Sequence, residues 1–95
     1  MDIKIDELKK IIDRLLDELR KRNNLIKVSD EDYYWFINDE ELFSPYEEPK
    51  SITLGQLSDD WSELQALLNE ERDCVSRDFV SLCSILRVIS KNEIW

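Results

Sequence analysis

The sequence predicts a helix-dominated α+β fold, with about three helices around a central C-terminal helix and a small two-stranded antiparallel sheet. Apolar residues recur every three or four positions over residues 3–22, and eight of the eleven residues in 79–89 are apolar. Between these stretches lies a run of aromatic and β-branched residues of the type that favours strands. The 95 residues form a single small domain, and one Gly and two Pro are too few for a turn-rich sandwich or barrel.

Residues 3–22 form the clearest predicted helix, because one stripe of its surface is apolar. The stripe consists of Ile5, Leu8, Ile12, Leu15 and Leu19, widened by Ile11 and Leu16. The same spacing fits a coiled-coil heptad, but about two and a half heptads are fewer than a sustained coiled coil needs. We therefore expect this helix to pack onto the C-terminal helix.

The acidic segment that follows has two interpretations. The run YYWFI at residues 33–37 is typical of a strand, and Asn38-Asp39 behind it is typical of a turn. Ser29 followed by three acids would instead begin a helix well, so the alternative is an all-α four-helix bundle in which residues 30–42 form a helix. Pro45 and Pro49 make the rest of this segment a loop.

Alternation within the strand at residues 33–37 predicts which side chains it buries. Tyr33, Trp35 and Ile37 are expected to face the core, and Tyr34 and Phe36 are expected to cover the other face. The competing interpretation is that these aromatics, surrounded by acids, form a protein-binding patch.

A second strand is predicted over residues 51–54 and a second long helix over residues 58–70. Gly55 follows the strand and is expected to supply a backbone angle that other residues avoid. Ser58 is the expected N-cap of the helix, and Asp59 and Asp60 lie at its positive end.

Residues 55–64, GQLSDDWSEL, carry the pattern G-x-L-x-D-D-W-x-x-L behind an acidic stretch that contains Tyr and Trp. This pattern resembles one found in small uncharacterised bacterial proteins with no assigned activity. The resemblance extends over about residues 33–90 and implies neither a function nor functional residues.

The C-terminal helix, predicted over residues 76–91, has little polar surface. Its polar residues fall on one narrow stripe, Ser81, Ser84, Arg87 and Lys91. Such a helix belongs in the middle of a small domain or in a subunit interface, because exposed Leu and Ile would forgo about 1.5–3 kcal/mol of burial each.

The net charge of −9 is unevenly distributed along the chain. Residues 29–73 carry fourteen acids and two bases, whereas residues 1–28 carry six acids and eight bases. The acidic segment repels phosphate backbones and anionic lipid, so we expect neither nucleic-acid nor membrane binding. A basic protein surface is the natural partner.

The composition excludes most enzyme chemistry. The chain has no His, which removes the usual general base and every histidine-containing zinc site. A single Gly excludes the glycine-rich phosphate-binding loops of nucleotide and dinucleotide sites. We expect no catalytic residues, no metal and no cofactor, and we interpret Asp59-Asp60 as helix-start residues rather than as a cation site.

These observations together predict a cytoplasmic, non-enzymatic, acidic protein-interaction module, for which an immunity or inhibitor protein is a concrete example. The candidate contact residues are Asp30, Glu31, Asp32, Tyr34, Phe36, Glu40, Glu41, Tyr46, Glu47 and Glu48. The alternative is a structural homo-oligomer, such as a homodimer, built on the apolar helices. A carboxylate-based hydrolase or cation binder is the remote alternative.

Overall fold

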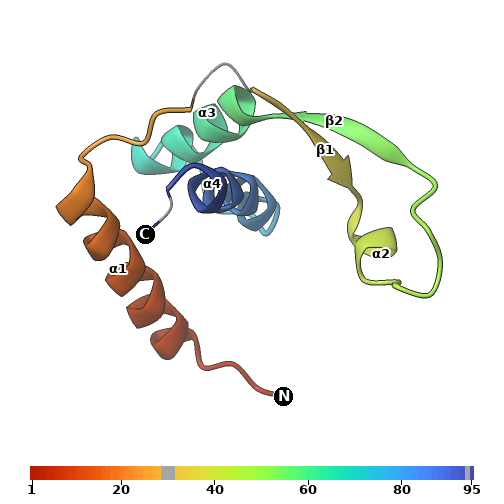
Figure 1. Cartoon of the computed structure of the whole chain (residues 1–95), viewed down its shortest axis with the longest axis horizontal. Helices are drawn as coiled ribbons and strands as arrows, with labels where there is room; N and C mark the ends of the chain where they lie inside the picture. The colour runs from red at the N-terminus through yellow and green to blue at the C-terminus, as the bar shows by residue number, and fades with distance from the viewer. Residues whose placement is uncertain (29–31, 94) are drawn as a thin grey trace.

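The computed structural model describes residues 1–28, 32–93 and 95. Its elements are α1 (Ile5–Arg22), β1 (Tyr33–Ile37), α2 (Asp39–Leu42), β2 (Ile52–Gln56), α3 (Leu57–Leu68) and α4 (Asp78–Asn92). Figure 1 shows α3 and α4 side by side, the strand pair extending from them and α1 standing apart. The predicted helix-dominated α+β fold is confirmed, and the four-helix alternative is wrong because residues 33–37 form a strand.

The two strands pair antiparallel, and the long connection between them carries the short helix α2. The register places Tyr34 opposite Gly55 and Trp35 opposite Leu54. Because directly opposed residues point to the same side of a sheet, Tyr34 and Gly55 share one face and Trp35 and Leu54 share the other.

Gly55 is needed for space and not for its backbone angle. Its φ is not positive. A Cβ at this position would instead overlap the ring of Tyr34, which lies across the glycine. The expectation that Gly55 supplies an unusual angle is therefore wrong, and the residue serves as the seat of the tyrosine ring.

The Tyr34 ring carries its hydroxyl across to the helices. Tyr34 Oη donates a hydrogen bond to Asp60 Oδ2 of α3 at 2.6 Å, and Ser84 Oγ of α4 donates to the same oxygen at 2.6 Å. Burial first, and then the hydrogen bond to Asp60, raise the pKa of Tyr34. The contribution of the Tyr34–Asp60 hydrogen bond to stability is therefore fully present below about pH 10, and it is lost as the pH rises through the folded-state pKa of Tyr34.

Helix α4 packs on α3 through the side that carries Ser81 and Ser84. Ser81 is buried, Ser84 is half-buried and Val88 is buried. Small side chains let the two helices approach closely, and Asp60 satisfies the hydroxyl of Ser84. The predicted covering of α4 is present on the side that packs on α3, but Phe79 and Leu86 on its other side are exposed.

The start of α4 is fixed by an ion pair with the loop that precedes it. Arg72 donates to both carboxylate oxygens of Asp78, at 2.7 and 3.1 Å, and to the Glu63 carbonyl of α3 at 3.0 Å. Asp78 also accepts the backbone N–H of Val75 at 2.8 Å. These hydrogen bonds lower the pKa of Asp78 and clamp the α3–α4 turn.

Helix α1 contacts the rest of the chain mainly at its C-terminal end. Leu19 is buried, Asn23 Nδ2 donates to Glu93 Oε2 at 3.1 Å, and Arg22 lies 4.8 Å from the centre of the Trp95 ring. Among the described residues, only β1 with β2 and α3 with α4 pack extensively. The expectation that the first helix packs along α4 is therefore wrong over most of its length.

Substituting Gly55→Ala tests the seat of the Tyr34 ring. The added methyl would overlap the ring, so we expect a loss of about 1–3 kcal/mol in the free energy of urea unfolding. In a Tyr34→Ala background the ring is absent, and the same substitution should be neutral or stabilising because it restricts the unfolded chain. Equal costs in both backgrounds would contradict this assignment.

Candidate protein-binding surface

Asp32 is the first candidate residue within the described part of the chain, since Asp30 and Glu31 lie outside it. Its Oδ1 accepts the Ser58 N–H at 2.8 Å, and its Oδ2 accepts the Ser58 hydroxyl at 2.8 Å and Gln56 Nε2 at 2.7 Å. Helix α3 begins at Leu57, so the expectation that Ser58 is its N-cap is wrong. The Asp32 carboxylate instead accepts the Ser58 N–H, which has no partner within the first turn of the helix. Asp32 therefore has a structural role that accounts for its charge.

Tyr34 and Phe36 also point inward. Tyr34 is half-buried against Asp60, and Arg77 lies 5.4 Å from the centre of the Phe36 ring. The side chain of Trp35 is 71% exposed and that of Tyr33 is also exposed. The predicted alternation is correct in period, but the assignment of Tyr33 and Trp35 to the core is wrong.

Glu41 braces the loop that leads into β2. Its Oε2 accepts the backbone N–H groups of Lys50 at 2.6 Å and Ser51 at 3.1 Å. Asn38 caps α2 by accepting the Glu41 N–H at 3.0 Å. The backbone hydrogen bond from Ser51 is the largest of the effects that lower the pKa of Glu41, so this carboxylate holds the loop as an anion.

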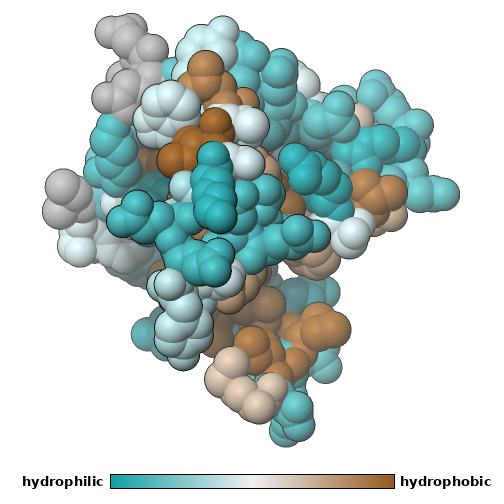
Figure 2. Space-filling model, turned by 90° about the vertical axis from the view of Figure 1, so that its right-hand side faces the viewer, coloured by the Kyte–Doolittle hydropathy of each residue, from teal (hydrophilic) through white to brown (hydrophobic). Residues whose placement is uncertain are grey.

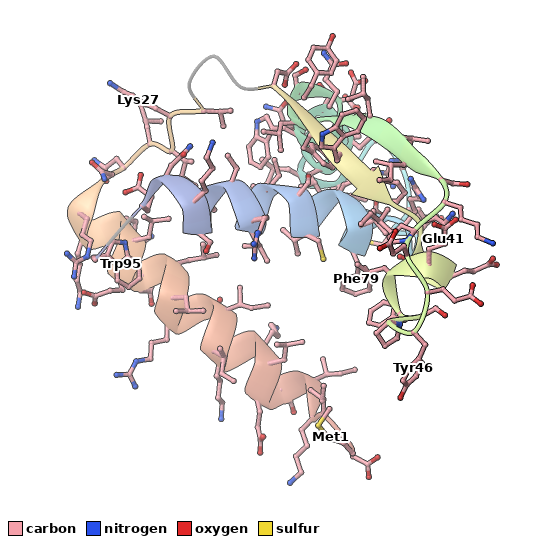
Figure 3. The ribbon with its side chains drawn as sticks, turned by 45° about the vertical axis from the view of Figure 1, so that its right-hand side comes forward. Met1, Lys27, Glu41, Tyr46, Phe79 and Trp95 are labelled. Carbon is pink, nitrogen blue, oxygen red and sulfur yellow. The ribbon has the colours of Figure 1, made fainter. Side chains whose placement is uncertain are left out.

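The remaining candidate residues gather at residues 39–49, which we call the hairpin tip. Glu40, Tyr46, Glu47 and Glu48 are all exposed there, and Figure 3 shows Tyr46 pointing away from the body of the molecule. Tyr46 is 96% exposed. The structure thus brings these four predicted residues together at one end of the strand pair. Tyr34 and Phe36 lie within β1 instead, and Asp32 lies at the start of α3.

The hairpin tip also contains two exposed apolar side chains that the candidate set omitted. Phe43 is 80% exposed, and Leu42 of α2 is exposed beside it. Together with Tyr46 and Pro45, Leu42 borders a hollow of about 340 Å³. The signal that could have found Phe43 is its position between an acidic helix and Pro45, where the chain has no strand or helix to bury it.

The tip is strongly negative. Residues 39–49 contain five acids and no base, and Lys50 is the first cation that follows. The end of the molecule that bears the tip faces the viewer in Figure 2, where the front of the surface is mainly hydrophilic. An exposed aromatic pair within such a field suits contact with a cationic protein surface.

A second hollow, of about 530 Å³, lies between β1 and α4. Tyr33 and Trp35 line one side, Leu57 and Val88 contribute apolar surface, and Arg87 contributes a positive charge. Its chemistry is therefore the opposite of that of the hairpin tip, being apolar and cationic where the tip is acidic.

Among the described residues, no group of three His, Cys, Asp or Glu side chains is placed to hold a metal ion. Cys74 and Cys83 are both exposed and unpaired with each other. In the same part of the chain, no helix has the length and apolar character required to cross a bilayer.

Asp32→Asn tests the role of the Asp32 carboxylate. Hydrogen bonds from Gln56 and Ser58 lower the pKa of Asp32, so its contribution to stability is present above about pH 4 and is lost as the pH falls through the folded-state pKa. The variant should lower Tm at neutral pH by about 4–8 °C, and the difference from the parent should shrink toward pH 2. Thermal scans from about pH 2 to pH 7 measure this. Glu71→Gln, an exposed carboxylate after α3, is the control and should change Tm little at any pH.

Comparisons with protein-family models, with curated proteins and with solved structures find no match to this chain.

Proposed function

We propose that this chain is a non-enzymatic, cytoplasmic protein-interaction module that presents its hairpin tip to a basic protein surface. The observation that carries the proposal is the exposure of Phe43 and Tyr46 among the carboxylates of residues 39–49. Large exposed aromatics are unfavourable in water, and they are the side chains that contribute most when a protein interface is formed.

The tip is also held in shape, which favours binding. Glu41 bonds two backbone amides across the loop, Asn38 caps α2, and Pro45 and Pro49 restrict the chain between them. A surface that is already ordered loses less conformational entropy on association. Glu41 is occupied by these hydrogen bonds, whereas Glu40, Glu47 and Glu48 are exposed and available to a partner.

Charge supports a basic partner. The five acids of the tip lie in a segment with a net charge of −12, from fourteen acids and two bases. Such a field accelerates encounter with a cationic surface and disfavours acidic proteins. An immunity or inhibitor protein that covers the cationic surface of a toxin is one instance of this function. The two free cysteines are in keeping with the reducing environment of the cytoplasm.

The experiment is affinity capture from the lysate of the source cells, followed by calorimetry with the purified partner. Phe43→Ala with Tyr46→Ala should weaken binding by about 10- to 100-fold, because both substitutions remove exposed contact area without touching the core. Raising the salt from about 50 to 500 mM should weaken binding of the parent by about tenfold or more.

Two matched variants control this measurement. Glu71→Gln with Asp73→Asn removes two exposed charges outside the tip, and Tyr33→Ala removes an exposed aromatic outside it. Both should change the affinity far less than the tip variant does. Capture of no basic protein at either salt concentration, or equal losses in the tip and control variants, would refute the proposal.

A further inference from the structure

Two helices of this chain leave apolar stripes uncovered. On α1 the uncovered stripe consists of Ile5, Leu8, Ile11, Leu15 and Leu16, all exposed. On α4 it consists of Phe79, Cys83 and Leu86, at steps of four and three, on the side away from the buried Ser81 and Val88. Phe79 is 71% exposed.

The two stripes start from the same end of the molecule. The C-terminal end of α1 is tied to the end of α4 through Asn23 with Glu93 and Arg22 with Trp95. From there, Figures 1 and 3 show α1 diverging from the rest of the chain toward Met1. In Figure 3, Phe79 lies at the far end of α4 and points to the side on which α1 lies. Figure 2 shows hydrophobic side chains over the lower part of the surface, where the chain and α1 begin.

The accessible surface is too large for a closed monomer. It measures 8683 Å², whereas a folded monomer of 11.4 kDa exposes about 5,800 Å². The radius of gyration is 15.1 Å, compared with about 12.4 Å for a compact domain of this length. The excess of about 2,900 Å² is larger than the roughly 800 Å² that each partner buries in a standard interface.

We propose that a second copy of this chain covers these stripes, so that the molecule is a two-fold dimer joined through α1 and the outer side of α4. Apart from Leu16, which widens the α1 stripe, both stripes recur in steps of three and four residues, the spacing with which helices pack against helices. A two-fold axis brings each stripe together with a copy of the same surface, which makes the interface self-complementary.

Charge favours a second copy over a basic partner on this face. Residues 1–28 carry eight bases and six acids, so two copies approach through α1 without the repulsion that the acidic middle of the chain would cause. The hairpin tip belongs to other elements, which leaves it available for the function proposed above.

Sedimentation equilibrium of the full chain at micromolar concentration tests the dimer. The expected mass is about 23 kDa, twice 11.4 kDa. Leu8→Lys with Leu15→Lys should shift the mass to that of the monomer, whereas Lys10→Ala with Asp17→Ala, on the polar side of α1, should leave the dimer intact. A monomer at all concentrations, or a dimer that survives the double lysine substitution, would overturn the proposal.

The native cysteines give a second measurement that needs no substitution. In the single chain both thiols are exposed, but Cys83 lies on the α4 stripe and Cys74 lies in the loop before α4. At concentrations where the dimer forms, Cys83 should react with a thiol reagent several-fold more slowly than at concentrations where the chain is monomeric, while Cys74 should not change. Equal behaviour of the two thiols in the dimer would place the interface on another face and overturn the proposal.

Discussion

The Asp60 carboxylate determines how three elements of this protein meet. One of its oxygens accepts the hydroxyl of Tyr34 from β1 and the hydroxyl of Ser84 from α4, both at 2.6 Å. An anion bonded to two hydroxyls is a strong, directional contact, and it fixes which side of the sheet and which side of α4 face inward. Because Tyr34 is inward, Trp35 is outward, and because Ser84 is inward, Leu86 is outward. The exposure of Trp35 and of the outer side of α4 follows from this single contact.

Sequence spacing predicts the elements better than it predicts their orientation. The steps of three and four predict α1, and the YYWFI run predicts β1, because these patterns depend on local geometry alone. In β1 both alternating sets are apolar, so the period cannot indicate which set is buried. The deciding feature is the absence of a side chain at Gly55, opposite Tyr34 across the strands. In α4, Ser81 and Ser84 are polar, so the sequence alone indicates a side that faces solvent. In the structure this side faces α3, where Asp60 accepts the Ser84 hydroxyl.

The candidate site shows the same limit. Composition identifies residues 30–48 as acidic and aromatic, and Glu40, Tyr46, Glu47 and Glu48 are indeed exposed together. Composition alone does not distinguish these exposed residues from Asp32 and Glu41, whose carboxylates accept hydrogen bonds from backbone N–H groups. Those amides come from Ser58, 26 residues away, and Lys50, nine residues away. Only the strand register brings them into reach.

Charge and apolar surface are separated on this molecule, and the separation has a physical consequence. The hairpin tip is negative with a few aromatic anchors, so its binding should depend on salt and on the charge of the partner. The α1 and α4 stripes are apolar and lie in segments of nearly balanced charge, residues 1–28 and residues 74–95. Their association should therefore depend on buried area and little on salt. The two surfaces share no residue. A dimer formed through the stripes would therefore keep both acidic tips accessible, and two linked tips would bind a partner with two basic sites more tightly than either tip alone, provided that the geometry allows both contacts.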